Sequence, residues 1–336
     1  MADSLLLQPH EVPGIQVKGD PEICTSMNDN FFLYCANDTL YSFDSSTLAN
    51  STLPQYDPAI SPAVITALAI SPSKTTAAAG FSNGSVQVFD LTKNVLSKSN
   101  IQKSDFSIKN IAFLDDFTIL CIDTAWILHY YSLANIKSLS SLTSYLVKGL
   151  KESFSIHLNT RVYQLLAAPV LYQKKGSVLF NNLACITTED TLYISKIGPS
   201  DKKEDIIVRK VNGAKATFSL QSNKSTLLCA YAAPCDISLI TIAPVGNTVN
   251  RISDIIDDVP LCINFISENT LIVIFSENSC LITSISDLQG SHTTVPISGK
   301  FLQGNKSLFV FGQLQPDAPT KLYEIRMVTF ENKIYA

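Results

Sequence analysis

One phrase recurs along the chain and limits what it can fold into. A short apolar run is followed by a turn of Asn, Asp or Gly, and then by a second apolar run that ends near Asp or Ser. Two apolar runs around such a turn are typical of a β-hairpin. The phrase occurs at 31–44, 76–90, 117–132, 183–195, 227–241, 271–285 and 308–325.

The spacing of these phrases predicts how the hairpins assemble. Successive turns lie roughly 40 to 46 residues apart, with one gap of about 66 between the third and the fourth. Four short strands with tight turns use about this length, which is one blade of a β-propeller. Nearly continuous apolar runs such as 271–275 indicate strands that are covered on both faces. We therefore expect an all-β fold: a single seven-bladed β-propeller domain over 1–336.

The second phrase, with the residues before it, carries the most specific resemblance. An apolar run at 64–70, the pair Ser71-Pro72, small residues at 77–80, the pair Asn83-Gly84 and a final run at 86–90 resemble a WD40 repeat. Phe89-Asp90 stands where that family commonly has Trp-Asp, and Phe43-Asp44 repeats the pair. The resemblance implies a degenerate WD40-like propeller over about residues 20 to 330. The family's Gly-His opening is absent, so we expect packing to replace much of its hydrogen-bonded network.

The long gap predicts an insertion between the third and fourth blades, near 133–155. Within it, 140–153 (SSLTSYLVKGLKES) has apolar residues at helical spacing: Leu142, Tyr145, Leu146 and Leu150. We expect one short helical insertion here. It either caps the edge of a blade or binds a partner.

The two ends of the chain are candidates for closing the ring. In WD40 proteins one terminus commonly completes a blade that the other began. The apolar pattern predicts that 327–335 pairs with 14–18.

Composition and charge limit the classes of partner that we expect the chain to bind. The chain is 46% hydrophobic and 16% charged, with a net charge of -4, so it has no global field for phosphate backbones. Nucleic acid is therefore unlikely as a direct partner. Lys174-Lys175 and Lys202-Lys203 favour solvated loop tips over an RNA contact.

The expected compartment follows from the cysteines and from apolar run lengths. Eight cysteines stand singly in apolar surroundings, without metal-ligand spacing, and are interpreted as small buried hydrophobes: Cys24, Cys35, Cys121, Cys185, Cys229, Cys235, Cys262 and Cys280. No apolar stretch is long enough to span a membrane, and the start lacks the features of a signal peptide. We expect a cytoplasmic and/or nuclear protein.

No residue pattern predicts catalysis, a cofactor or a metal. The four histidines (His10, His129, His157 and His292) are scattered, and His129 favours a structural role inside a strand. Asp115-Asp116 and Asp257-Asp258 are interpreted as turn residues, because adjacent side chains diverge. Trp126 is either buried between blades, which its apolar strand favours, or an exposed interface residue.

These observations favour a non-catalytic scaffold: a propeller that binds other proteins as a subunit of a larger eukaryotic complex. Two alternatives stay open. One is a regulator of a small GTPase that resembles the Sec12-like exchange factors of vesicle traffic, although this chain shows neither their membrane helix nor their Gly-rich loop. The other is a propeller subunit of a ribosome-biogenesis or nuclear-pore assembly.

Overall fold

The computed structural model confirms an all-β fold, with strands and no helix among the residues that it describes. The described residues are 5–17, 25–28, 31–36, 39–44, 47, 49–52, 63–92, 95–96, 102–137, 146–168, 171–172, 178–180, 182–199, 202–212, 216–223, 226–243, 246–253, 258–267, 269–276, 279–285, 290–294, 300–305, 308–312 and 320–329. Side chains are described for a subset of these, all between Phe31 and Ile285.

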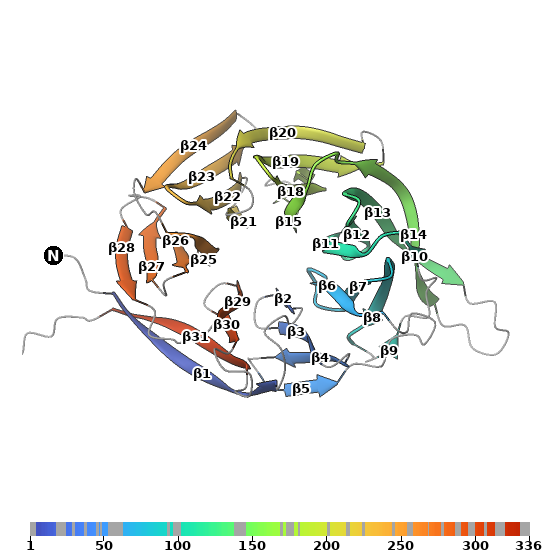
Figure 1. Ribbon diagram of the computed structural model, residues 1–336, viewed down its shortest axis with the longest axis horizontal. Coiled ribbons are helices and arrows are strands. Elements are labelled where there is room, and N and C mark those ends of the chain that lie inside the picture. The colour runs from blue at the N-terminus through green and yellow to red at the C-terminus, as the bar shows by residue number, and fades with distance from the viewer. Residues whose placement is uncertain are drawn as a thin grey trace, which may run out of the picture.

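The described strands form seven antiparallel sheets of four or five strands, arranged as a ring in Figure 1, and one two-stranded sheet. In chain order, the first sheet holds β2 (Thr25–Asn28), β3 (Phe31–Ala36), β4 (Thr39–Asp44) and β5 (Ala49–Thr52). The second sheet holds β6 (Ile65–Ile70), β7 (Thr76–Phe81), β8 (Ser85–Asp90), β9 (Val95–Leu96) and β10 (Gln102–Lys103). The third sheet holds β11 (Ile108–Asp115), β12 (Thr118–Asp123), β13 (Ile127–Lys137) and β14 (Leu146–His157).

The next three larger sheets complete most of the ring. They hold β15 (Val162–Ala167), β18 (Leu183–Thr188), β19 (Thr191–Gly198) and β20 (Lys202–Lys210); β21 (Thr217–Asn223), β22 (Thr226–Ala233), β23 (Asp236–Ala243) and β24 (Gly246–Ser253); and β25 (Pro260–Ser267), β26 (Thr270–Phe275), β27 (Ser279–Ser284) and β28 (Gly290–Thr294). The last larger sheet holds β29 (Lys300–Asn305), β30 (Leu308–Gly312), β31 (Thr320–Thr329) and β1 (Leu5–Val17), and the two-stranded sheet holds β16 (Leu171–Tyr172) and β17 (Val178–Phe180).

Each repeated sequence phrase forms the middle hairpin of one larger sheet. The hairpins are β3–β4, β7–β8, β12–β13, β18–β19, β22–β23, β26–β27 and β30–β31. Strands β7, β12 and β18 are buried along their whole length, as the continuous apolar runs predict. The sheet with β6, β7 and β8 also has the turns that the WD40-like repeat predicts.

The core is divided among the interfaces between neighbouring sheets. One cluster joins Ala78 and Val88 of the second sheet to Ile111 and Cys121 of the third. Similar clusters lie between the first and second, third and fourth, fourth and fifth, and fifth and sixth sheets. Because apolar burial stabilises by about 25 cal/mol per Å², the second to fifth sheets, which have a described cluster on both sides, depend on their neighbours for much of their stability.

Small residues allow the second and third sheets to approach closely. Strand β7 reads Thr-Ala-Ala-Ala-Gly-Phe, and a Cβ at Gly80 would lie 2.4 Å from Cγ2 of Ile108 in β11. A residue without a side chain is therefore a packing requirement at Gly80.

The predicted helix over 140–153 is wrong from Leu146 onward. Residues 146–157 form β14, which pairs with β13 in register from Ile127↔His157 to Lys137↔Leu146. Cross-strand pairing overrides the helical spacing of the apolar residues. The rest of the predicted helix, 140–145, lies outside the described residues.

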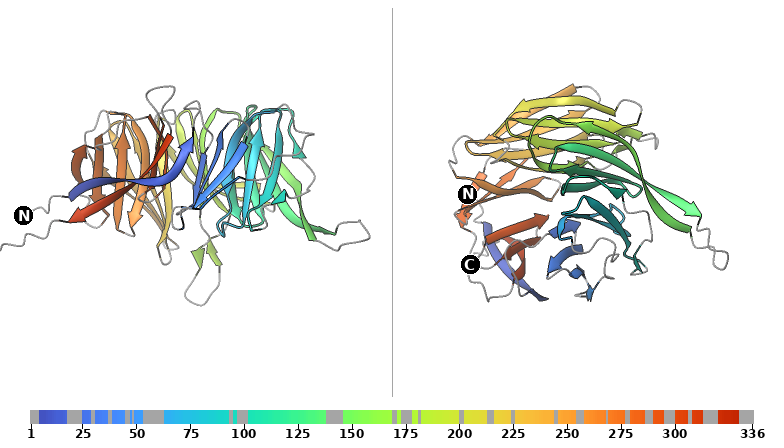
Figure 2. Two further views of the ribbon diagram at one scale, coloured as in Figure 1. Left: turned by 90° about the horizontal axis from the view of Figure 1, so that it is seen from below. Right: turned by 45° about the vertical axis from the view of Figure 1, so that its right-hand side comes forward.

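Two β-insertions account for the long gap between the third and fourth phrases. Strand β13 continues five residues past Ser132, its last residue paired with β12, and forms a two-stranded ribbon with β14. Figure 2 shows this ribbon running beyond the disc. The second insertion is the β16–β17 hairpin between β15 and β18, which projects from one face of the disc in Figure 2.

The chain ends do close the ring, but in a different register from the predicted one. Strand β1 pairs with β31 from Leu5↔Thr329 to Val17↔Thr320, so Met327 lies opposite Leu7 and not within 14–18. The register shifts between Val12 and Val17, a stretch that includes Pro13. Residues 330–335 lie outside the described part.

Candidate interaction site

The β12–β13 turn contains a buried polar cluster. Asp123 is fully buried at the end of β12, and its Oδ1 accepts hydrogen bonds from the backbone N–H groups of Ala125 (2.9 Å) and Ile127 (3.0 Å). Its Oδ2 accepts a bond from Ser104 Oγ (2.8 Å) and lies 2.9 Å from His129 Nε2. These partners compensate for the loss of water around the carboxylate.

The His129 ring joins two carboxylates. Its Nδ1 lies 2.7 Å from Glu152 Oε1 on β14, and its Nε2 faces Asp123 on the other side. The ring therefore lies between a carboxylate at the end of β12 and one on β14. Burial acts to raise the pKa of Asp123, but the bonds from His129, Ile127 and Ser104 outweigh it and hold that pKa below its usual value.

Ser104 connects this cluster to the neighbouring sheet. It lies between β10 and β11, and its backbone N–H donates to the Gly84 carbonyl (2.9 Å) in the β7–β8 turn. Its hydroxyl donates to Asp123. One serine therefore joins the turns of two adjacent sheets, just before the first strand of its own repeat. The sequence predicts that packing replaces much of the WD40 hydrogen-bonded network, and at these turns side-chain hydrogen bonds contribute as well.

A second polar cluster lies at the β22–β23 turn. Asp236 accepts bonds from the Tyr231 hydroxyl (2.5 Å) and the Ser238 hydroxyl (2.8 Å), and Arg209 Nη2 of the preceding sheet lies 3.3 Å from it. The Arg209 guanidinium also lies 4.9 Å from the centre of the Tyr231 ring. Burial, followed by the bond to Asp236, raises the pKa of Tyr231 to about 12. This cluster too links neighbouring sheets.

A pocket of about 180 Å³ opens between the third and fourth larger sheets. Its lining comes from the end of β14, the connection to β15, and strands β18, β19 and β20: Ile156, His157, Leu158, Thr160, Ile186, Thr188, Tyr193, Lys203 and Asp205. Ile156, Leu158, Ile186 and Tyr193 also belong to or pack on the apolar cluster between these sheets. The apolar floor of the pocket is therefore the part of this cluster that lines the pocket.

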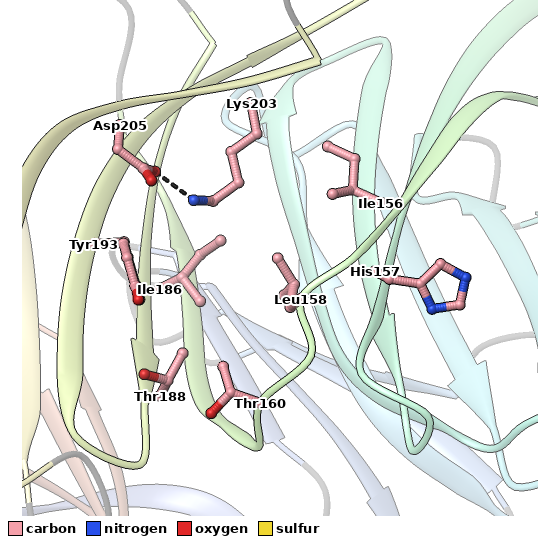
Figure 3. A pocket seen from close by; sticks show the side chains of 9 residues that line it. All are labelled: Ile156, His157, Leu158, Thr160, Ile186, Thr188, Tyr193, Lys203 and Asp205. Atoms are coloured by element: carbon pink, nitrogen blue, oxygen red, sulfur yellow. Dashed lines mark hydrogen bonds and ion pairs between the residues drawn. The ribbon is translucent and has the colours of Figure 1, made fainter.

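Charged and hydroxyl groups surround this apolar floor. Figure 3 shows Lys203 directed toward Asp205, with Thr160 and Thr188 at the opposite end of the pocket. Lys203 Nζ lies 4.6 Å from the centre of the Tyr193 ring, and Ser195 Oγ donates to Asp205 (2.6 Å). The Lys203 side chain is only 17% exposed. Neighbouring groups therefore hold both charges in place.

The pocket is small, and its histidine is directed away from its hydroxyl groups. The His157 ring points away from the other lining side chains in Figure 3, so it does not face Thr160 or Thr188 as a general base would. At about 180 Å³, the pocket is below the roughly 300–1,000 Å³ typical of sites for drug-sized ligands. One apolar side chain with a polar neighbour matches its size and lining.

The structure places the residues singled out in the sequence analysis in different kinds of position. His129 lies inside β13, as predicted, with a carboxylate beside each ring nitrogen, and Asp115-Asp116 lie at the β11–β12 turn. Trp126 packs against the cluster between the third and fourth sheets and is partly buried, with φ of 61°. Asp258 lies near β25 and accepts bonds from Val259 N–H and the Ser276 hydroxyl. Asp257 is outside the described residues.

Two predictions about exposure need correction. Cys35, Cys121, Cys185, Cys229 and Cys262 are buried, but Cys235 is exposed because it lies in the β22–β23 turn. Lys203 is not a solvated loop tip, because it is in β20 and pairs with Asp205. Cys24 and Lys174-Lys175 are outside the described residues, and nothing is described of the side chains of His10, His292, Lys202 or Cys280.

Among the described residues, no three His, Cys, Asp or Glu side chains come together as metal ligands. No helix in this part of the chain has the length and apolarity to cross a bilayer.

Sequence reasoning did not find the pocket or the role of Ser104. The pocket residues come from four strands and a connection between 156 and 205, and no local pattern relates them. Ser104 stands in a short polar stretch that reads as an ordinary loop.

Comparison with known proteins identifies the fold. No family model matches the chain, and no curated protein sequence does. A chain in the crystal structure of the mitotic checkpoint complex matches with a TM-score of 0.62 and 10% identity, over 94% of this chain and 90% of that one. The β-propeller domain of Myceliophteria thermophila Cps50 (Swd1) matches with a TM-score of 0.61 and 12% identity, over 95% of this chain and 100% of that domain.

These likenesses place the chain among the β-propellers. The repeat at 64–90 resembles a WD40 repeat. At 10% and 12% identity the comparisons show the fold alone.

Proposed function

We propose that residues 1–336 form one seven-bladed propeller domain, each larger sheet being a blade, and that it is a non-catalytic scaffold within a larger eukaryotic protein complex. The observation that carries this proposal is the pocket between the third and fourth sheets. It offers an apolar floor and a fixed charged rim on a ring whose sheets support one another. Such a site recognises a side chain of another protein.

The structural neighbours support the proposal. One is a chain of the mitotic checkpoint complex, which is by name a multi-protein assembly. A rigid ring with many turns and outer strand edges suits simultaneous contacts with several proteins. No nucleic-acid partner is proposed, because the net charge of -4 gives no general attraction to phosphates.

The direct test is purification of the tagged chain from its natural source under mild conditions. We expect stoichiometric protein partners. Recovery of the chain alone, repeated at low salt and after cross-linking, would contradict the scaffold function. A guanine-nucleotide release assay on small GTPases that co-purify would separate a scaffold from a Sec12-like regulator.

Two variants test the pocket itself. Thr160→Trp places a large ring at the pocket wall, and Lys203→Met removes the rim charge while keeping most of the apolar stem. Both should reduce recovery of a pocket-bound partner. Lys210→Met is the matched control, because Lys210 is on the same strand and also pairs with an aspartate, but its side chain is 78% exposed and does not line the pocket. Equal recovery with all three variants would exclude the pocket as the binding site.

We also propose that the protein works in the cytoplasm and/or the nucleus. Supporting this, Cys121, Cys185, Cys229 and Cys262 are buried thiols outside any disulfide, as is usual in a reducing compartment. Imaging of the tagged protein tests the location, and accumulation in the secretory pathway would contradict it.

A further inference from the structure

The ion pair at the rim of the pocket can form further hydrogen bonds. Lys203 Nζ and Ser195 Oγ both donate to Oδ1 of Asp205. Among the described residues, Oδ2 of Asp205 has no hydrogen-bond partner, and Lys203 Nζ donates only to Asp205. An ammonium has three N–H groups, and each carboxylate oxygen can accept. A bound molecule can therefore accept from Lys203 and donate to Asp205 at the same time.

The rim favours a neutral group over a charged one. Because Lys203 and Asp205 are in contact, a carboxylate that approaches Lys203 also approaches Asp205, and an ammonium that approaches Asp205 also approaches Lys203. Like charges repel, and water screens these two side chains incompletely, since they are only 17% and 34% exposed. In an extended chain, the N–H and C=O of one residue point to the same side and carry no net charge. Such a residue can bind both groups of the rim.

The walls of the pocket favour an aliphatic side chain on that residue. Ile156, Leu158 and Ile186 line the pocket and belong to or pack on the apolar cluster between the third and fourth sheets. The hydroxyl groups of Thr160 and Thr188, at the opposite end from the ion pair in Figure 3, are uncharged as well. At about 180 Å³ the pocket is too small for a drug-sized ligand and matches one side chain.

An exposed apolar residue continues this surface toward the outer strand of the fourth sheet. Tyr193 lies opposite Ile186 of β18 on one side and opposite Val208 of β20 on the other. Directly opposite residues of neighbouring strands point to the same face of a sheet, so Val208 shares the face that lines the pocket. Val208 is 59% exposed, the largest exposed fraction among the large hydrophobic residues whose side chains are described. A second apolar side chain can therefore pack beside the first.

We propose that the pocket binds an extended, uncharged segment of a partner protein. An aliphatic side chain of the segment enters the pocket, the N–H of the same residue donates to Asp205, and its C=O accepts from Lys203. A second apolar side chain, two residues along the segment, packs on Val208. This inference rests on the proposed scaffold function and names the chemistry of the partner at the same site.

The test uses three leucine derivatives that share one side chain and differ in charge. N-acetyl-leucine N-methylamide is neutral, N-acetyl-leucine is anionic, and leucine N-methylamide is cationic. Their binding to the full 336-residue chain is measured by ligand-observed NMR at millimolar concentration. We expect the neutral probe to bind about fivefold or more tightly than either charged probe, because only it avoids a like charge at the rim.

Two charge variants should change this preference in opposite directions. Lys203→Met leaves Asp205 as the charge of the ion pair, so the cationic probe should gain about fivefold or more relative to the neutral one. Asp205→Asn leaves Lys203, so the anionic probe should gain by a similar factor. Lys210→Met and Asp190→Asn are the matched controls, because that pair is also in contact but does not line the pocket. Circular dichroism and thermal unfolding check that each variant is folded.

A longer probe, acetyl-Leu-Ala-Leu N-methylamide, tests the contact with Val208. Alternate side chains of an extended chain point to the same face, so its second leucine can reach this residue. It should bind about threefold or more tightly than the neutral single-leucine probe, and Val208→Ser should remove the gain. Val249→Ser is the matched control, because Val249 is also exposed (46%) on the outer strand of its sheet and does not line the pocket.

Several results would overturn the proposal. These are a wild-type chain that binds none of the probes or binds all three equally, a neutral probe that still binds the Thr160→Trp variant, or an order of preference that neither charge variant changes. The comparison on the wild-type chain needs no variant to fold. If the probes behave as expected but no partner co-purifies, the scaffold function fails and the chemistry of the pocket stands. If partners co-purify with the Thr160→Trp variant and the probes show no selectivity, the scaffold function stands and this proposal fails.

Discussion

The β7–β8 turn and the β12–β13 turn have the same backbone requirement but meet it with different residue types. Each needs one residue with a left-handed backbone. The first uses Gly84 (φ 81°), which matches its WD40-like sequence, and the second uses Trp126 (φ 61°). Glycine adopts this conformation without steric cost, whereas tryptophan is strained in it. The Asp123 cluster and the packing of Trp126 between two sheets offset that strain.

The comparison also shows why the two turns cannot be treated separately. A Cβ at Gly84 would lie 2.1 Å from the Ser104 carbonyl oxygen, and Ser104 is also a hydrogen-bond partner of Asp123. The glycine in one sheet therefore allows the serine to reach the aspartate of the next. The resemblance to a WD40 repeat, strong in the second sheet, continues into the third as a hydrogen-bond network with different side chains.

The largest effect is expected from Asp123→Ala. This change leaves the buried His129 ring, the Ser104 hydroxyl and two backbone N–H groups without their acceptor. We expect a loss of about 3 to 5 kcal/mol in the free energy of unfolding, measured by chemical denaturation. Asn83→Ala in the β7–β8 turn should cost less than about 1.5 kcal/mol, because the Asn83 side chain accepts from the Ser85 N–H within its own turn and is not a buried charge. Equal losses would show that the two turns do not differ as described.

The next largest loss of stability is expected from substituting the residues with positive φ. Gly84→Ala should destabilise by about 2 to 4 kcal/mol, because the new Cβ meets the Ser104 backbone and the backbone is strained. Trp126→Gly should cost only about 1 to 2 kcal/mol, because relief of strain offsets part of the lost packing. A double-mutant cycle of Gly84→Ala with Ser104→Ala should be non-additive. Additive losses would contradict the link through Ser104.

A moderate loss of stability is expected at acidic pH. The pKa values of Asp123 and Asp236 are lowered in the folded protein, after their hydrogen bonds outweigh burial. The folded state then binds fewer protons than the unfolded state, so the stabilisation is full above the unfolded pKa of about 3.9 and is lost as pH falls through the folded values. The free energy of unfolding should therefore decline below about pH 4. In the Asp123→Asn variant this decline should be shallower, and an unchanged slope would contradict the assignment.

The smallest effect is expected from the exposed pair of Asp190 and Lys210 at the β18–β19 turn. Their side chains are 66% and 78% exposed, so water and salt screen the attraction. Lys210→Met should leave the thermal midpoint unchanged within error. Arg209→Met, which removes a contact to Asp236 and to the Tyr231 ring, should lower it measurably. A larger drop in the thermal midpoint for Lys210→Met than for Arg209→Met would show that exposure does not determine how much each cluster stabilises the fold.

Much of the fold could be predicted from local patterns. The seven hairpin phrases, the WD40-like repeat at 64–90 and the structural role of His129 follow from hydrophobic runs and turn residues, which act over a few positions. The helix over 140–153 failed because its spacing is helical locally, while its hydrogen bonds go to β13. The closing register failed because two distant segments set it together.

The sequence alone determined that the chain forms repeated hairpins with both faces apolar, since side-chain size and turn preference are local properties. Only the tertiary structure decided which residues meet between the sheets. The pocket joins residues from 156 to 205, and Ser104 meets Asp123 across nineteen positions. Such contacts depend on how neighbouring sheets pack around the ring, because the chain brings these residues together only when each sheet finds its neighbour.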